Sequence, residues 1–182
     1  MASLLTSYTR HKTFISHHHA DENEVSEFID FYDHDHDVLI SRGIGASMAG
    51  DVIGSNDSDY IKRRIRELYL RESTVTLVMV GVETWGRRFV DWEIAASLRN
   101  TSTSARNGLV AITLPAVANM VGRQPPARVS DNVDGDFGFA RWMKYPTSAG
   151  SLARIIDEAY QRRSTHAHVV ANRRALRSRN AS

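Results

Sequence analysis

Glu93 is the carboxylate in this sequence whose neighbours best suit chemistry on a sugar. It stands about one to two turns into an expected helix after the most apolar segment, residues 73–80, beside Trp92 and after Asp91. A carboxylate partly shielded by aromatic rings can bind sugar hydroxyls and stabilise positive charge at an anomeric carbon. An ordinary surface or salt-bridged glutamate is the competing interpretation, and spacing alone favours it.

Two histidine clusters contain groups that divalent cations accept as ligands. The first is His17-His18-His19 with Asp21, and the second lies in residues 33–37. Consecutive side chains on an extended backbone point in alternating directions, so the three histidines cannot converge on one ion, and we expect no metal site. His17 or His18 could instead contact a ligand phosphate or ribose. An exposed polar loop is the alternative.

The usual motifs for nucleotide binding and ester hydrolysis are missing from the sequence. The segment Arg42-Gly-Ile-Gly45 lacks the third glycine of the dinucleotide fingerprint, and neither a P-loop nor a GxSxG elbow occurs. Gly43 and Gly45 are therefore expected to give a loop its flexibility. Trp85 and Trp92 could form an aromatic wall for a base, whereas packing between helix and sheet is the competing role for at least one of them.

The composition is that of one ordinary globular domain. The chain has 182 residues, of which 42% are hydrophobic and 24% are charged. The absence of cysteine excludes disulfides, thiolate nucleophiles and cysteine-ligated metals. No apolar run is long enough to cross a bilayer, and the first residues are too polar for a signal peptide. We therefore expect a cytoplasmic protein without a membrane partner.

Five β-prone segments alternate with helical segments along the chain. The strands are expected at 12–16, 37–41, 73–80, 108–114 and 140–145, and the helices at 21–31, 58–69, 84–98 and 151–160. Thr84 is the expected cap of the third helix, and residues 115–138 are expected to form an irregular connection. The alternation predicts a doubly wound α/β domain of flavodoxin-like size, whose ligands bind beyond the carboxyl ends of the parallel strands.

Positive charge is concentrated towards the end of the chain. Residues 154–182 hold seven arginines and two acidic residues, whereas the rest of the chain has a small acidic excess. Clustered arginines attract phosphates irrespective of base sequence, but no aromatic residues interleave with them as base stacking requires. We therefore favour a single domain at 1–165 with a solvated, frayed basic tail at 166–182, and we expect no nucleic acid partner.

Four segments together resemble the TIR-like family that includes the sensor protein of bacterial Thoeris antiphage systems. The segments are Phe14-Ile-Ser-His17, Asp59-Tyr-Ile-Lys62, Ser73–Gly81, and Glu83-Thr-Trp85 leading to Trp92-Glu-Ile94. The resemblance covers about residues 10–115. Its most specific part is the central strand followed by an aromatic-rich segment that ends in Glu-Ile.

The resemblance implies a TIR fold with a central five-stranded parallel sheet and an NAD⁺ nucleosidase or ADP-ribosyl cyclase activity. Such an enzyme cleaves the nicotinamide–ribose bond and releases a cyclic or modified ADP-ribose that activates a separate effector protein. The family's catalytic glutamate falls on Glu93, and the implied substrate-binding residues are Phe14, Ser16, His17, Trp85 and Trp92. NAD⁺ is the substrate, and neither a metal nor a cofactor is implied because the pyridinium is already a good leaving group.

Two departures from the family pattern leave the product open. Many TIR hydrolases carry a tryptophan four residues before the glutamate, where this chain has Phe89, and residues 115–138 have no clear counterpart. Water, adenine or a ribose hydroxyl could therefore be the acceptor. A non-enzymatic scaffold assembling through the loop at 42–57 is the main alternative. A phage-derived trigger, low basal turnover and a homo-oligomer are further expectations from the resemblance.

Overall fold

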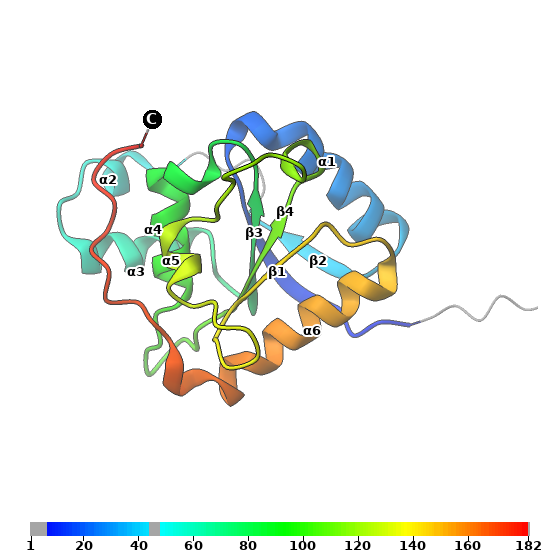
Figure 1. Ribbon diagram of the computed structural model, residues 1–182. Helices are drawn as coiled ribbons and strands as arrows, with labels where there is room; N and C mark the ends of the chain where they lie inside the picture. The colour runs from blue at the N-terminus through cyan, green and yellow to red at the C-terminus, as the bar shows by residue number, and fades with distance from the viewer. Residues whose placement is uncertain (1–6, 44–47, 182) are drawn as a thin grey trace, which may run out of the picture.

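A five-stranded parallel sheet forms the centre of the computed structural model, which describes residues 7–43 and 48–181 (Figure 1). The strands are β1 His11–Ser16, β2 Leu39–Arg42, β3 Val75–Val80, β4 Gly108–Thr113 and β5 Arg141–Met143. The α-helices are α1 Glu22–Ile29, α2 Gly50–Ile53, α3 Ser58–Leu68, α4 Arg88–Ser97, α5 Ala127–Ser130 and α6 Ala149–Thr165. Shorter helical segments are η1 His19–Asp21, η2 Asp30–Asp35, η3 Thr84–Gly86, η4 Pro115–Val117 and η5 Ala167–Val169.

The strand order is β2-β1-β3-β4-β5, and all four neighbouring pairs are parallel. This arrangement confirms the predicted doubly wound α/β fold. The order reverses between β1 and β3, because the chain builds β2 on one side of β1 and every later strand on the other. Ligands of such sheets bind at this switch point, beyond the carboxyl ends of the two strands.

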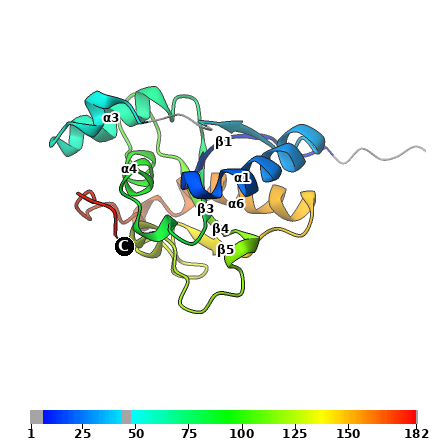
Figure 2. The ribbon, with the colours of Figure 1, turned by 90° about the horizontal axis from the view of Figure 1, so that it is seen from above.

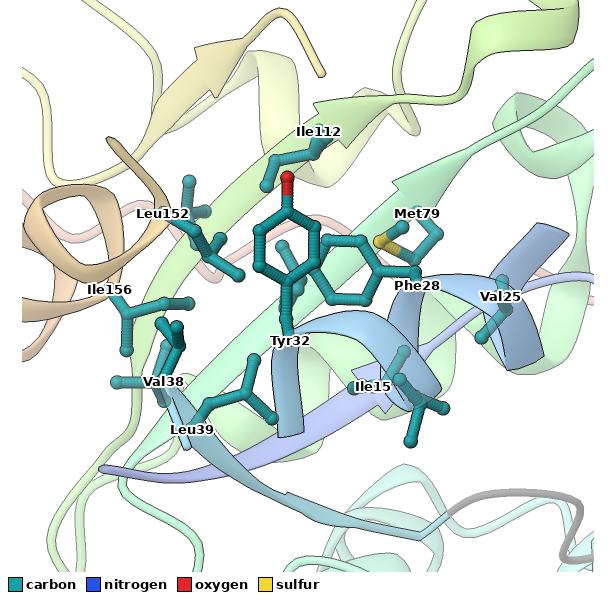
Figure 3. Packing of buried hydrophobic residues seen from close by; sticks show 14 of the residues in the cluster. Ile15, Val25, Phe28, Tyr32, Val38, Leu39, Met79, Ile112, Leu152 and Ile156 are labelled. Carbon is teal, nitrogen blue, oxygen red and sulfur yellow. The ribbon is translucent and has the colours of Figure 1, made fainter. Parts of the chain in front are cut away.

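Helices cover both faces of the sheet (Figure 2). Side chains of β3 alternate between the faces: Leu77 packs in a core with α1 and α6, whereas Val78 packs in a core with α4 and α5. Figure 3 shows the first core, where Phe28 of α1 and Leu152 of α6 meet the sheet. The continuous apolar sequence of β3 follows from this burial on both faces.

Helix α3 packs through an apolar stripe onto the β1 and α4 side of the domain. Its Ile61 and Ile65 are buried in one cluster with Phe14 of β1 and Trp92 of α4. The helix begins after Asp57, whose carboxylate accepts hydrogen bonds from the free amides of Asp59 and Tyr60. Asp57 therefore caps α3, directly before the first residue of the helix expected at 58–69.

The prediction that Thr84 caps a helix is wrong. Helix α4 begins at Arg88, and Thr84 opens the short turn η3 instead. Its hydroxyl accepts from the Gly81 amide at 2.9 Å and lies 3.2 Å from an Asp21 carboxylate oxygen. A Cβ on Gly81, the residue after β3, would fall 2.1 Å from that carboxylate, so the present position of Asp21 depends on a glycine there. Burial raises the pKa of Asp21.

The irregular connection at 115–138 contains two short helices, η4 and α5, and α6 is longer than expected. Ser148 and Ser151 form a reciprocal capping box at the start of α6, which places its first residue at 149. Gly45, with the rest of 44–47 in the predicted loop, lies outside the described residues. Across the described ranges, no helix has both the length and the apolar character that a bilayer crossing demands.

Candidate active site

A cavity of about 540 Å³ opens beside the carboxyl end of β1, against the first half of α4. Residues from β1, the segment after it, the loop around α2 and helix α4 line it. The lining residues are Ile15, His17, His18, His19, Glu22, Gly43, Met48, Ile53, Arg87, Phe89, Val90, Glu93 and Asn180. The volume lies in the range of sites that bind drug-sized ligands.

Glu93 lines this cavity and is hydrogen-bonded to Ser16, which is 1% exposed and is not itself a lining residue. The Ser16 hydroxyl at the end of β1 donates to Oε2 of Glu93 at 2.5 Å. Burial raises the pKa of Glu93 to about 7, and the hydrogen bond from Ser16 opposes that rise. The carboxyl group therefore changes charge near neutral pH and can take up or release a proton there.

The two neighbouring histidines at the cavity are held in the neutral form. His17 has its pKa lowered by burial, and its Nδ1 is buried without a hydrogen-bond partner. Burial, Arg87 and the adjacent histidines lower the pKa of His18 to about 4. Neutral imidazoles offer one donor and one acceptor each to a ligand. Across the described ranges, no three histidine or acidic side chains are arranged to hold a metal ion.

Arg87 and Phe89 add a cation and an aromatic ring to the wall. The Arg87 guanidinium contacts Glu83, while its Nε is buried and lacks a hydrogen-bond partner. A guanidinium with an unused donor suits a phosphate oxygen. Phe89 stands four residues before Glu93 and shares its face of α4, so both line the cavity.

Three of the residues that the sequence assigns to substrate lie elsewhere. Phe14 is buried beneath Gly43, whose φ of 74° and close approach to the ring require glycine. Trp92 is buried, and its indole N–H donates to the Arg177 carbonyl. Adjacent residues of a helix point about 100° apart, so Trp92 does not share the direction of Glu93. Trp85 lies beside a separate hollow. None of the three lines the Glu93 cavity.

A family model for the TIR-like domain of the Thoeris protein ThsB matches residues 14–119, more than half of the chain. The match runs from β1 to just beyond β4 and contains both Ser16 and Glu93. The chain belongs to the ThsB TIR-like family. No curated protein matches it. The family match and the strand order together make the chain a Thoeris-associated TIR protein with a doubly wound fold.

Beyond the family match, this ThsB-type chain ends in a segment that folds back over the domain. We call residues 170–181 the C-terminal strap. Figure 1 shows it running past α5 and α4. Val170 packs against the core of α4 and α5, and Leu176 packs in the cluster that contains Trp92. The expectation of a solvated, frayed tail is wrong for these residues, because apolar contacts and main-chain hydrogen bonds hold them.

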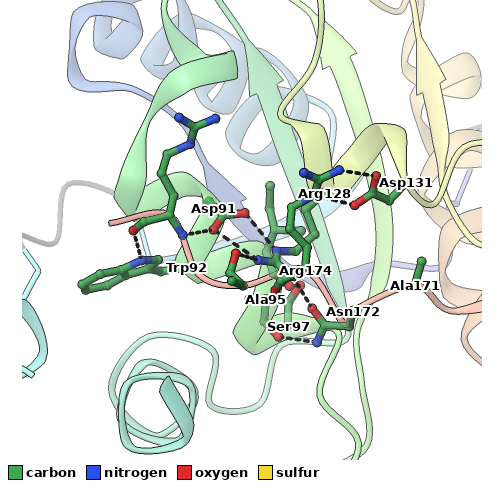
Figure 4. Close-up of polar contacts among 12 residues, drawn as sticks. Asp91, Trp92, Ala95, Ser97, Arg128, Asp131, Ala171, Asn172 and Arg174 are labelled. Carbon is green, nitrogen blue, oxygen red and sulfur yellow. Dashed lines mark hydrogen bonds and ion pairs between the residues drawn. The ribbon is translucent and has the colours of Figure 1, made fainter. Parts of the chain in front are cut away.

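The strap is hydrogen-bonded to both members of a buried ion pair, one of which lies on the helix that carries Glu93 (Figure 4). Arg128 of α5 donates to both carboxylate oxygens of Asp91, at 2.9 and 3.2 Å. Asp91 also accepts from the Arg177 amide, and Arg128 donates to the carbonyls of Arg174 and Ala175. Asp91 therefore acts within α4 as a structural anchor and faces away from the cavity.

Asn180, near the end of the strap, is one of the residues that line the Glu93 cavity. Its side-chain oxygen accepts from the Arg88 amide at 2.8 Å, so it satisfies a free N–H at the start of α4. Sequence reasoning missed Asn180 because nothing local links it to α4. It also missed Arg87, which precedes the first residue of α4 and is not at a helical spacing from Glu93.

Proposed function

We propose that this protein is an enzyme of antiphage defence that cleaves the nicotinamide–ribose bond of NAD⁺ in the cytoplasm. Its product is a cyclic or modified ADP-ribose, which activates a separate effector protein. The observation that carries the proposal is the hydrogen-bonded pair of Ser16 and Glu93 at the switch-point cavity. Membership of the ThsB TIR-like family supports the same reaction class.

Glu93 would act on the ribose next to nicotinamide. As the C1′–N bond breaks, positive charge develops at C1′, and a carboxylate held in a partly buried site stabilises it more strongly than water does. Ser16 keeps one carboxylate oxygen in place, which leaves Oε1 available to the ribose. Nicotinamide departs with the electron pair of the broken bond, so no acid is needed to protonate it.

An acceptor then forms the new bond to C1′. If water attacks, the products are ADP-ribose, nicotinamide and a proton. If a hydroxyl or the adenine of the same molecule attacks, a cyclic product forms. Glu93, with a pKa of about 7, can accept the proton that a hydroxyl acceptor loses. Arg87 faces the same cavity and is suited to the diphosphate, and Phe89 is suited to stacking on a ring.

The decisive experiment compares small molecules in cells that express wild-type or Glu93→Gln protein, with and without phage challenge. Chromatography with mass spectrometry should detect an ADP-ribose-type product only when Glu93 is intact. We expect the substitution to lower product formation by at least about a hundredfold, because it removes the charge without changing the shape of the side chain. Glu27→Gln is the matched control, since Glu27 is exposed on α1 and outside the cavity.

Two results would contradict the proposal. Equal product from wild-type and Glu93→Gln cells would remove Glu93 from the reaction. The absence of any product under several phages, with folded protein present, would favour the non-enzymatic scaffold. That scaffold predicts assembly in light scattering that depends on the loop at 42–57.

A further inference from the structure

A second cavity, of about 530 Å³, lies at the opposite end of the sheet from Glu93. It is bounded by the last turns of α3, the segment leading into β3, and the loop between α4 and β4. Its lining residues are Arg63, Arg66, Glu67, Arg71, Glu72, Arg99, Thr101, Thr103 and Ser104. It shares no lining residue with the Glu93 cavity, and the family match assigns it no role.

Three of the four arginines that line this second cavity have no ion-pair partner in the described residues, whereas Arg99 lies 3.7 Å from an Asp59 carboxylate oxygen. In the described part of the chain, no carboxylate lies within ion-pair distance of Arg63, Arg66 or Arg71. The two glutamates on the wall are already paired with other cations: Glu67 accepts from Arg64 at 3.0 Å and Glu72 accepts from Lys12 at 2.9 Å. The wall therefore presents uncompensated positive charge.

Arg66 is the fixed centre of this charge. Its side chain is buried, with 9% of the residue exposed. Its guanidinium donates to Ser104 Oγ at 2.7 Å, to carbonyls at the end of α4 and to the Ala105 carbonyl, so each of its three nitrogens has a protein partner. All of these partners are neutral. Burial lowers the pKa of Arg66, and Arg163 and Arg99 lower it further because they are also positive. The guanidinium is thus rigid, partly desolvated and close to other positive charges. A bound anion would stabilise its charged form.

The hydroxyl groups on the wall complete the chemistry. Ser104 Oγ accepts from Arg66, so its own hydrogen is available to a ligand, and Thr101 and Thr103 stand in the same loop. Arginine forks and hydroxyl donors together are the usual partners of phosphate oxygens. The volume exceeds what one phosphate needs and suits a ligand of nucleotide size.

We propose that this cavity binds a small molecule that carries two or more phosphate groups, with Arg63, Arg66 and Arg71 as its cationic contacts. Arg63 and Arg66 come from the last two turns of α3 and Arg71 from the segment after it, so separate phosphates can be bridged between them. The site is separate from the proposed NAD⁺ reaction and goes beyond it.

Pyrophosphate is the probe, titrated by calorimetry at low ionic strength, where exposed charges are little screened. We expect saturable binding to the wild type, and binding weakened by about tenfold or more in the double variant Arg63→Ala/Arg71→Ala. Both residues are exposed, so their removal should leave the fold intact. The control is Arg154→Ala/Arg173→Ala, which removes equal charge from exposed positions outside both cavities.

Further variants separate this site from the Glu93 cavity. Glu93→Gln should bind pyrophosphate as the wild type does, whether or not the protein cleaves NAD⁺, and Arg87→Ala identifies any pyrophosphate held at the first cavity. The proposal is overturned if the wild type shows no saturable binding, or if the two double variants bind equally well. It is also overturned if a single-stranded oligonucleotide binds far more tightly than pyrophosphate and depends on the same two arginines, because the ligand would then be a nucleic acid backbone.

Discussion

The burial of the Glu93 carboxyl group makes the stability of this protein depend on pH. The pKa of Glu93 rises from 4.5 to about 7 on folding because burial disfavours the charged carboxylate. The folded chain therefore holds this proton more tightly than the unfolded chain. Its contribution to stability is fully present below 4.5 and is lost as pH rises through about 7.

We predict that the unfolding free energy of the wild type, relative to Glu93→Gln, falls by up to about 3 kcal/mol between those two pH values. Urea unfolding at several pH values measures it without any assumption about activity. Glu27→Gln should follow the wild type, since Glu27 is exposed. Parallel curves for the wild type and Glu93→Gln would mean that the glutamate titrates normally.

Single residues of the site differ in how far the sequence reveals them. Glu93 could be singled out because it follows a buried strand at a helical distance, and the resemblance to TIR proteins strengthened that choice. Ser16 and His17 could be placed because they end a predicted strand. The roles of Arg87 and Asn180 depend on where side chains from different segments come together, and neither composition nor periodicity contains that information.

At the scale of elements, α4 is held in place by the buried pair of Asp91 and Arg128. Asp91→Ala would leave the Arg128 guanidinium buried without a carboxylate, and we predict a loss of about 3–5 kcal/mol in unfolding free energy. Arg128→Ala should cost a similar amount, and the double variant should cost less than the two single variants together. Asp136→Ala is the control, because its pair with Arg141 is exposed and should contribute no more than about 1 kcal/mol. Additive losses from the two single variants would show that the pair does not act as a unit.

The elements themselves were largely predictable, and their ends were not. All five strands lie within a few residues of the β-prone segments. The signal is clearest for β3 and β4, because burial on both faces demands continuous apolar runs that the sequence displays directly. Helix α4 begins later than expected because the Thr84 hydroxyl bonds to the end of β3 and to Asp21 instead of capping the helix. A capping residue and a residue that closes a turn have the same type, and only the tertiary contacts distinguish them.

For the whole molecule, the doubly wound parallel sheet followed from the alternation of strands and helices, but the path of the C-terminal strap did not. An arginine-rich segment with few large apolar residues looks like a solvated tail. Side chains of α4, α5 and the segment after α5, namely Asp91, Arg128 and Asn132, hold it by hydrogen bonds to its main-chain groups. Asn132 illustrates this, because it exchanges two hydrogen bonds with the backbone of Ala171.

The strap also links the stability of α4 to the last residues of the chain. A chain that ends after residue 169 loses Val170, Leu176 and the strap carbonyls that accept from Arg128, so we predict faster amide hydrogen exchange in α4 and α5 than in α1 and α6. A chain that ends after residue 178 keeps the ion-pair region and loses Asn180, the side chain that accepts from the first amide of α4. This shorter truncation should destabilise the protein by about 1 kcal/mol, with faster exchange confined to the first turn of α4. Equal acceleration of amide exchange in all four helices after the longer truncation would mean that the strap stabilises the domain as a whole. A selective effect on α4 and α5 would show that the strap holds the helix on which Glu93 stands.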